Sequence, residues 1–326
     1  MNLLVSSTRE GPFAGDSNFY RKARSLQRKL HESSGLFPSE LYIEGVELQY
    51  DGRQVGHGGF ADIFKGLWNA SPVAIKRLRS HVDHAKAREA LFREAFTWEH
   101  LNHPRILPFL GLDFDSFPTY LPCIVTPWME NGTILQHIKR NVLPIESIET
   151  LLLEITQGLA YLHDKEVVHG DIRGNNILID ECWHVRLADF GLTGFTNETL
   201  RTVSSINHAG SARWMAPELH NPERAGLDRF VRTKASDIYA LGCTILEIYT
   251  GNVPFSDVPE EGAVAMHVTY HSLRPERPPE ISIDRWSLME DCWRQDHLKR
   301  STVALVLKHM EDMNFGVSVE ENGDSN

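Results

Sequence analysis

Two short segments in the middle of the chain carry carboxylate and amide side chains that could hold a metal ion and accept a proton. The first is residues 169–176 (HGDIRGNN), and the second is residues 189–191 (DFG). An aspartate such as Asp171 can accept or orient a hydroxyl proton, and the amide oxygen of Asn176 is a hard ligand suited to Mg²⁺. Asp189 precedes a flexible glycine, where a carboxylate can hold a metal ion against a phosphate.

Two stretches nearer the N-terminus could meet phosphate oxygens. Residues 56–63 (GHGGFADI) are rich in glycine, whose backbone can lie close over a ligand, although glycine clusters also form plain turns. Lys76 ends a β-prone run (VAIK) and could reach phosphates if it shares a sheet with this stretch. Its flexible side chain needs a partner. We expect Glu94 to be that partner because apolar residues flank it, whereas Glu89 and Glu99 read as surface charges.

The elements that must position these residues change along the chain from strands to helices. Strand-like stretches come first and surround one helical pattern, while helical patterns dominate from residue 133 onward. The expected strands are 41–51, 73–76, 124–125, 167–168 and 177–179, while 55–64 is rich in glycine and 185–188 is apolar. The expected helices include 83–101, 148–163, 236–250 and 285–293. This order predicts a small β-rich lobe followed by a larger α-helical lobe.

Composition excludes several classes of protein. The 326 residues are 41% hydrophobic and 24% charged, which is enough for a large core, and the net charge of -11 argues against a nucleic-acid-binding role. No apolar run approaches the ~18 residues of a transmembrane helix, and we expect no signal peptide. The cysteines, far apart in sequence, read as buried thiols in a reducing compartment, so we expect a cytoplasmic protein. They are Cys123, Cys182, Cys243 and Cys292.

The two ends of the chain read differently from its centre. Residues 1–40 form an N-terminal extension in which 19–31 has the pattern of a short basic amphipathic helix. We favour a solvated helix docked on the main domain over a membrane-surface or partner-docking element. Residues 314–326 are acidic and read as a disordered tail, which leaves residues 41–313 as the main domain.

Five motifs together resemble the eukaryotic protein kinase family in order and spacing. They are Gly56-x-Gly58, Val-Ala-Ile-Lys76, His-x-Asp171 with Asn176, Asp189-Phe-Gly and Ala216-Pro217-Glu218. Asn176 follows Asp171 by 5 residues, Asp189 follows it by 18, and Glu218 follows Asp189 by 29. Residues 237–242 (DIYALG), Cys292-Trp293 and Arg300 extend the likeness to the end of the domain. Each motif is unspecific alone, but the ordered set is specific.

The resemblance implies an α+β, bilobal kinase fold, with an N-lobe over about 41–129 and a C-lobe over about 130–313. It implies transfer of the γ-phosphate of ATP, with Mg²⁺, to a protein substrate. Asp171, Lys76, Glu94 and Arg173 would be catalytic, and Asn176 and Asp189 would bind the metal. The nucleotide-binding set would be Val55, Gly56, Gly58, Ile63, Ala74, Lys76, Thr126, Trp128 and Met129, with Thr126 as gatekeeper and 126–129 as hinge.

The resemblance also implies supporting roles. Glu218 would pair with Arg300, Asp237 would hold the catalytic loop, and His169 would be buried below the Asp-Phe-Gly turn rather than act as a base or ligand.

The chain departs from the family pattern at three positions. Ala61 replaces the third glycine of the loop, a small change. Gly170 replaces the arginine that grips an activation-loop phosphate, so we predict activity that does not depend on phosphorylating Ser or Thr within 193–205. Arg173 replaces the lysine typical of serine/threonine kinases, which leaves the hydroxyl specificity open.

Residues 210–218 (GSARWMAPE) resemble the corresponding segment of tyrosine-kinase-like serine/threonine kinases. We therefore favour transfer to Ser and Thr. A tyrosine or dual-specificity kinase and a pseudokinase scaffold stay as alternatives, whereas small-molecule kinases generally lack the Ala-Pro-Glu segment.

Overall fold

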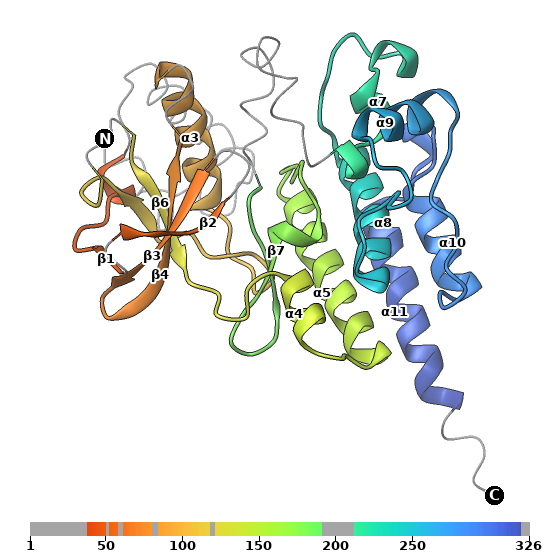
Figure 1. The fold of residues 1–326 in the computed structure, drawn as a ribbon, viewed down its shortest axis with the longest axis horizontal. Helices are drawn as coiled ribbons and strands as arrows, with labels where there is room; N and C mark the ends of the chain where they lie inside the picture. The colour runs from red at the N-terminus through yellow and green to blue at the C-terminus, as the bar shows by residue number, and fades with distance from the viewer. Residues whose placement is uncertain are drawn as a thin grey trace, which may run out of the picture.

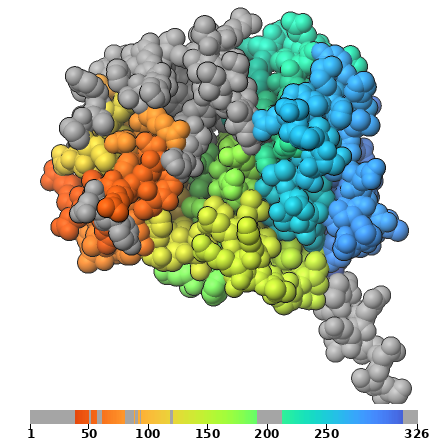
Figure 2. Space-filling view, in the orientation of Figure 1, coloured from red at the N-terminus to blue at the C-terminus, as the bar shows by residue number. Residues whose placement is uncertain are grey.

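The structure is a computed structural model that describes residues 38–49, 52–57, 61–79, 84–117, 121–190 and 212–320. Strands and one long helix come first, and most of the remaining chain is helical (Figure 1). In Figure 2 the orange strand region and the blue C-terminal helices lie on opposite sides of the yellow-green segment that contains α4 and α5. The predicted bilobal α+β fold is confirmed. The helix predicted over 19–31 and Gly58 lie outside the described residues.

The N-terminal part is an antiparallel six-stranded sheet in the order β1-β3-β4-β6-β5, with β2 paired to β3. Lys76 lies opposite Ile63 on one side and Ile124 on the other, so it shares the sheet with the glycine-containing strand as predicted. The strands are β1 Glu47–Leu48, β2 Gln54–His57, β3 Ala61–Trp68, β4 Ser71–Leu78, β5 Gly111–Asp113 and β6 Cys123–Pro127.

Helix α3, His84–Trp98, is the main helix of this part. Its apolar residues Leu91, Ala95 and Trp98 recur at helical spacing, and each is almost fully buried in the large core. Trp98 Nε1 also donates a hydrogen bond to the carbonyl of Leu107 at 2.6 Å. Because the buried stripe fixes the rotation of the helix, Glu94 is also held inside, at 2% exposure.

The helical part is built around α8, Lys234–Thr250. Every residue of α8 from Ser236 to Ile248 is buried, as expected for a helix surrounded on all sides. Thr233 and Ser236 form a capping box at its start, and Gly251 ends it with a left-handed φ of 66°. The other helices are α4 Ile134–Arg140, α5 Ile145–Asp164, α7 Pro217–His220, α9 Glu261–Tyr270, α10 Ile283–Cys292 and α11 Val303–Glu320. Strands β7, Ile177–Ile179, and β8, Val185–Leu187, form a separate antiparallel pair.

Several expectations need correction. The predicted strand over 41–51 is shorter in the described residues 41–49, where the two-residue strand β1 and a single β-bridge from Tyr42 to Leu112 follow the 3₁₀ turn Ser39–Leu41. Val167 and Val168 form no strand. They belong to the connection between α5 and the loop that starts at His169, whose backbone N–H donates a hydrogen bond to Asp237. Helix α11 continues through Glu320, so residues 314–320 are helical where a disordered tail was predicted.

The cysteines and helices also bear on the expectations about location. All four cysteines are free, and Cys182 is exposed, so the prediction of buried thiols is wrong at that position. Among the described residues, no helix is both long enough and apolar enough to cross a bilayer. The boundaries at 40/41, 129/130 and 313/314 stay predictions.

Candidate active site

Lys76 is the buried cation at the centre of the site. Its Nζ lies 2.7 Å from Asp189 Oδ1 and 3.8 Å from Glu94 Oε1, and its residue exposure is 7%. The three residues come from β4, α3 and the segment after β8, and are distant in sequence. One ammonium group therefore connects the sheet, its helix and the Asp189 segment.

The charges of this cluster are strongly coupled. Burial raises the pKa of Glu94 to about 7, although Lys76 opposes the shift. Burial acts to lower the pKa of Lys76, but Asp189, Glu94 and Asp171 outweigh it and raise that pKa. Burial likewise acts to raise the pKa of Asp189, but Lys76 outweighs it and lowers that pKa. Lys76 is thus held charged, while Glu94 titrates near neutral pH.

Asp171 and Asn176 lie together in the loop that precedes β7. The Asn176 Nδ2 atom donates to the backbone oxygen of Asp171 at 2.8 Å and to its Oδ2 at 2.7 Å. Arg173 Nε lies 3.7 Å from the same Oδ2. Because both Asn176 contacts use the amide nitrogen, the amide oxygen is left for another ligand.

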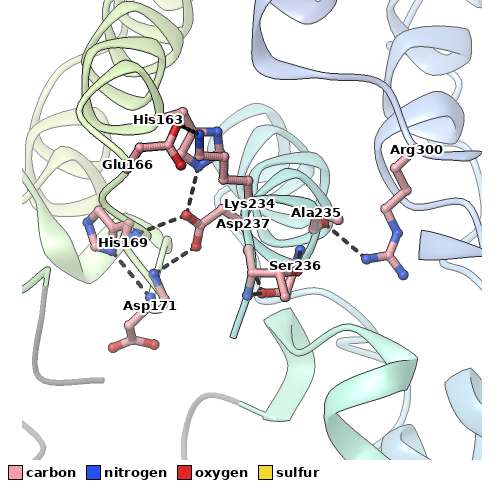
Figure 3. Close-up of polar contacts among 11 residues, drawn as sticks. His163, Glu166, His169, Asp171, Lys234, Ala235, Ser236, Asp237 and Arg300 are labelled. Carbon is pink, nitrogen blue, oxygen red and sulfur yellow. Dashed lines mark hydrogen bonds and ion pairs between the residues drawn. The ribbon is translucent and has the colours of Figure 1, made fainter. Parts of the chain in front are cut away.

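Asp237 connects this loop to the first turn of α8 (Figure 3). Its carboxylate accepts from the backbone N–H of His169 at 2.8 Å and of Gly170 at 2.7 Å, and His163 Nε2 lies 2.9 Å away. Gly170 has a φ of 79°, a conformation that disfavours side chains. The position of Asp171 is therefore set by α8, whose residues from Ser236 to Ile248 are all buried.

Asp189 has a left-handed φ of 58°, and the residue after it points into the core. Phe190 packs edge-on against Trp98 at 4.9 Å and against His169 at 5.9 Å between ring centroids. His169 is fully buried, and burial lowers its pKa, which leaves it neutral. The backbone strain at Asp189 is balanced by this aromatic packing, which fixes the carboxylate beside Lys76.

The carboxylate of Asp189 and the amide of Asn176 supply the hard oxygen donors that Mg²⁺ prefers. The Asp189 side chain is 31% exposed and uses Oδ1 for Lys76. The donor chemistry of these two residues therefore fits a divalent cation.

The described residues among those predicted to contact a nucleotide lie on four neighbouring strands, β2, β3, β4 and β6, and on the segment after β6. Ala74 is paired with the buried Thr126 across β4 and β6, and Gly56 is opposite Ile63 across β2 and β3. The Trp128 backbone N–H donates to the Pro72 oxygen at 3.0 Å, and the next residue, Met129, packs partly buried against the large core. Val55, on β2, is exposed.

Glu247, on α8, has a role that the sequence analysis missed. Its Oε2 accepts from the backbone N–H of Gly174 at 2.9 Å and from Trp214 Nε1 at 3.0 Å. The Arg173 guanidinium lies 5.7 Å from the centroid of the Trp214 ring. Burial raises the pKa of Glu247 to about 7, against the effect of these two donors. The signal in the sequence was an acidic residue that interrupts the mostly apolar run of residues 240–249.

The segment 212–218 is fixed by two buried cations. Arg213 donates to four carbonyl oxygens, those of Pro254, Phe255, Val258 and Pro259, at 2.6 to 3.1 Å. Arg300 binds both carboxylate oxygens of Glu218 at 2.6 Å, as the resemblance implied. Trp214 and Met215 lie between these two anchors.

Comparisons with known proteins agree with this geometry. The model of the family "Protein tyrosine and serine/threonine kinase" matches residues 50–310. A probable serine/threonine-protein kinase of Dictyostelium discoideum is 32% identical over 84% of the chain and 29% of its own length. The dual specificity protein kinase pyk3 of the same organism is 30% identical over 89% of the chain and 21% of its length.

The serine/threonine/tyrosine-protein kinase HT1 of Arabidopsis thaliana is 26% identical over 92% of the chain and 80% of its length. The chain thus spans less than a third of the two Dictyostelium relatives. The order of the motifs, the two-part fold and the family match lead to one conclusion: the chain belongs to the family of protein tyrosine and serine/threonine kinases.

Proposed function

We propose that this protein is an ATP-dependent kinase that phosphorylates Ser and Thr hydroxyls of protein substrates. The observation that carries the proposal is the convergence on Lys76 of Asp189 at 2.7 Å and Glu94 at 3.8 Å. This convergence places one cation beside a metal-type carboxylate. Asp171 and Asn176, hydrogen-bonded to each other, supply a proton acceptor and an amide oxygen.

Each of these residues has a role in the proposal that follows from its position. Lys76 binds the α- and β-phosphates of ATP, and Glu94 limits the freedom of its long side chain. Asp189 and Asn176 hold Mg²⁺, which neutralises phosphate charge when bound. Asp171 orients the substrate hydroxyl and accepts its proton, while Arg173 stays beside that carboxylate.

The nucleotide-facing roles of Val55, Gly56, Gly58, Ile63, Ala74, Thr126, Trp128 and Met129 are part of the same proposal. The pairing of Ala74 with the buried Thr126 supports it on the described side of the site. A cytoplasmic location also belongs to the proposal and rests on the four free cysteines.

Transfer to Ser and Thr is favoured by the resemblance of residues 210–218 to tyrosine-kinase-like serine/threonine kinases. The names of the relatives, most of which are serine/threonine kinases, favour it as well. Two of those names also include tyrosine or dual specificity, pyk3 and HT1. Analysis of the phosphorylated amino acids after the reaction decides between these readings. Phosphotyrosine as the main product would refute the Ser/Thr assignment.

A radiolabelled-ATP assay on a protein substrate tests the proposal with Asp171→Asn. We expect turnover to fall about 10²- to 10⁴-fold, because the variant keeps the shape but loses the proton acceptor. Asp164→Asn is the matched control, since Asp164 is an exposed carboxylate at the end of α5. Thermal shift with ATP and Mg²⁺ should be retained in both variants.

Equal incorporation by the wild type and the Asp171 variant would assign the signal to a contaminant. A thermal shift with nucleotide but no transfer by the wild type would make the protein a pseudokinase scaffold.

A further inference from the structure

Arg232 lies beside the catalytic loop, and none of the roles above uses it. It stands just before Thr233, the residue that caps α8. Together with Gly170, Asp171, Trp214 and Met215 it lines a cavity of about 10 Å³, which has room for roughly one water molecule. Arg232 is the single cation among the described residues that line this cavity.

The charge of Arg232 is incompletely satisfied. Its Nε is buried and has no hydrogen-bond partner among the described residues. Its guanidinium carbon lies 5.9 Å from the centroid of the Phe230 ring. Burial lowers the pKa of Arg232 even though Asp171 and Asp237 act to raise it. The two carboxylates therefore offset only part of the cost of burying the guanidinium charge.

Two neighbouring cations have hydrogen-bond acceptors of the kind that Arg232 Nε lacks among the described residues. Lys234, two residues later, binds Glu166 at 2.8 Å. Arg213, on the facing segment, is surrounded by four carbonyl oxygens. Asp237, which lines the same cavity as Arg232, is already used by the backbone of His169 and Gly170.

A buried donor without a partner is uncommon in proteins, and it costs stability unless a ligand completes it. A guanidinium is completed best by a carboxylate or a phosphate, which can accept two parallel hydrogen bonds. The cavity holds only about one water molecule, so such an anion would meet the guanidinium at the edge of the cavity. Because Asp171 lines the same cavity, the anion would still lie close to the hydroxyl that Asp171 orients. An extended peptide advances only about 3.3 to 3.6 Å per residue, so the anion belongs to a residue one or two positions from the acceptor.

We propose that Arg232 is a specificity-determining residue that selects protein substrates with an acidic or phosphorylated side chain one or two residues from the acceptor Ser or Thr. This inference rests on the proposed kinase function. It names the substrate class more narrowly than that function does. The alternative is a structural role, in which Arg232 only balances the charges of Asp171 and Asp237.

A positional-scanning library of Ser/Thr peptides, phosphorylated with labelled ATP, tests the selection. The measured quantity is the ratio of transfer to peptides with Asp, Glu or phosphoserine over transfer to peptides with Ala at each position. For the wild type we expect a ratio of roughly tenfold at one position within two residues of the acceptor, the size of a charge-assisted hydrogen bond. Arg232→Gln should bring that ratio near one, and Arg232→Lys should keep part of it.

Arg229→Gln is the matched control, because Arg229 is an exposed arginine three residues away. It should keep the wild-type ratio. A wild-type profile without acidic preference, or an Arg232→Gln enzyme that retains it, would overturn the inference. Equal loss on all peptides together with a lower melting temperature would also overturn it, in favour of the charge-balancing role.

Phosphatase treatment of the enzyme tests whether the anion that binds Arg232 is instead a phosphate group on the kinase itself. If treatment lowers transfer by the wild type but not by Arg232→Gln, the anion is a phosphate on the kinase itself, and the substrate-selecting role is refuted. If the wild type transfers phosphate to no peptide, the proposed function fails and this inference fails with it. Transfer without acidic preference refutes the inference alone.

Discussion

Replacing Glu247 with glutamine separates the charge of this residue from its hydrogen bonds. Gly174 N–H and Trp214 Nε1 donate to the same atom, Oε2, at 2.9 and 3.0 Å. A glutamine oxygen in that place accepts both bonds, since a carbonyl oxygen has two lone pairs. Glu247→Gln therefore removes the buried negative charge and leaves both donors paired.

The size and sign of the effect follow from the pKa of Glu247. Burial raises it from 4.5 to about 7, and each pKa unit corresponds to about 1.4 kcal/mol. The ionised form is thus disfavoured in the fold by about 3 kcal/mol. Because the folded-state pKa is the higher one, the stabilising effect of the bound proton is complete below pH 4.5 and is lost as the pH rises through 7.

Urea unfolding of both proteins, followed by tryptophan fluorescence, measures this effect. Near pH 5 the unfolding free energies of the two proteins should be similar. By pH 8 the glutamine variant should have gained about 2 to 3 kcal/mol relative to the wild type. Other titrating groups are common to both proteins and cancel in the difference.

Glu247→Ala serves as the contrasting variant. It leaves two buried donors without an acceptor and should lower the unfolding free energy at every pH, by about 2 to 5 kcal/mol. A gap between Glu247→Gln and the wild type that does not change from pH 5 to pH 8 would refute the argument from burial.

Three further outcomes are expected. Glu218→Ala leaves Arg300 buried without its carboxylate, so it should lower the unfolding free energy by about 3 to 5 kcal/mol in urea melts, and an unchanged midpoint would contradict the buried pair. Because the pKa of Glu94 is about 7, its ion pair with Lys76 weakens as the pH falls below 7, and kcat/KM for ATP should drop from pH 8 to pH 6. A Glu94→Gln enzyme with the same pH profile as the wild type would refute the assignment of this drop to Glu94. Gly170→Ala places a side chain at a φ of 79° and should cost about 1 to 2 kcal/mol, measured as a lower Tm; a Tm equal to that of the wild type would show that this conformation is not strained.

The sequence predicted the parts of the site that depend on local pattern and order. Lys76 could be assigned to a strand and Glu94 to the buried face of a helix because apolar residues repeat with the period of each element. Asp171, Asn176 and Asp189 were singled out by their residue types in short loops beside apolar runs, and the resemblance of the ordered motifs to the protein kinase family implied their roles.

Contacts that depend on how elements approach one another could not be predicted. Glu247 lies on an apolar helix, and only the packing of α8 against the loop brings Gly174 and Trp214 to it. The sequence analysis did not single out Arg232, because partial burial of a guanidinium leaves no local pattern. Val167 and Val168 are β-branched, but tertiary contacts outweigh that weak preference and leave them outside any sheet.

The four carbonyl oxygens around Arg213 have a consequence for controlling the protein from outside. They belong to the turn between α8 and α9, residues 254–259, and they fix the backbone next to Trp214. An antibody fragment that distorts this turn would shift Trp214 and the cavity that it lines with Arg232, while Lys76 and its carboxylates stay in place. Inhibition of that kind would be competitive toward neither ATP nor the metal.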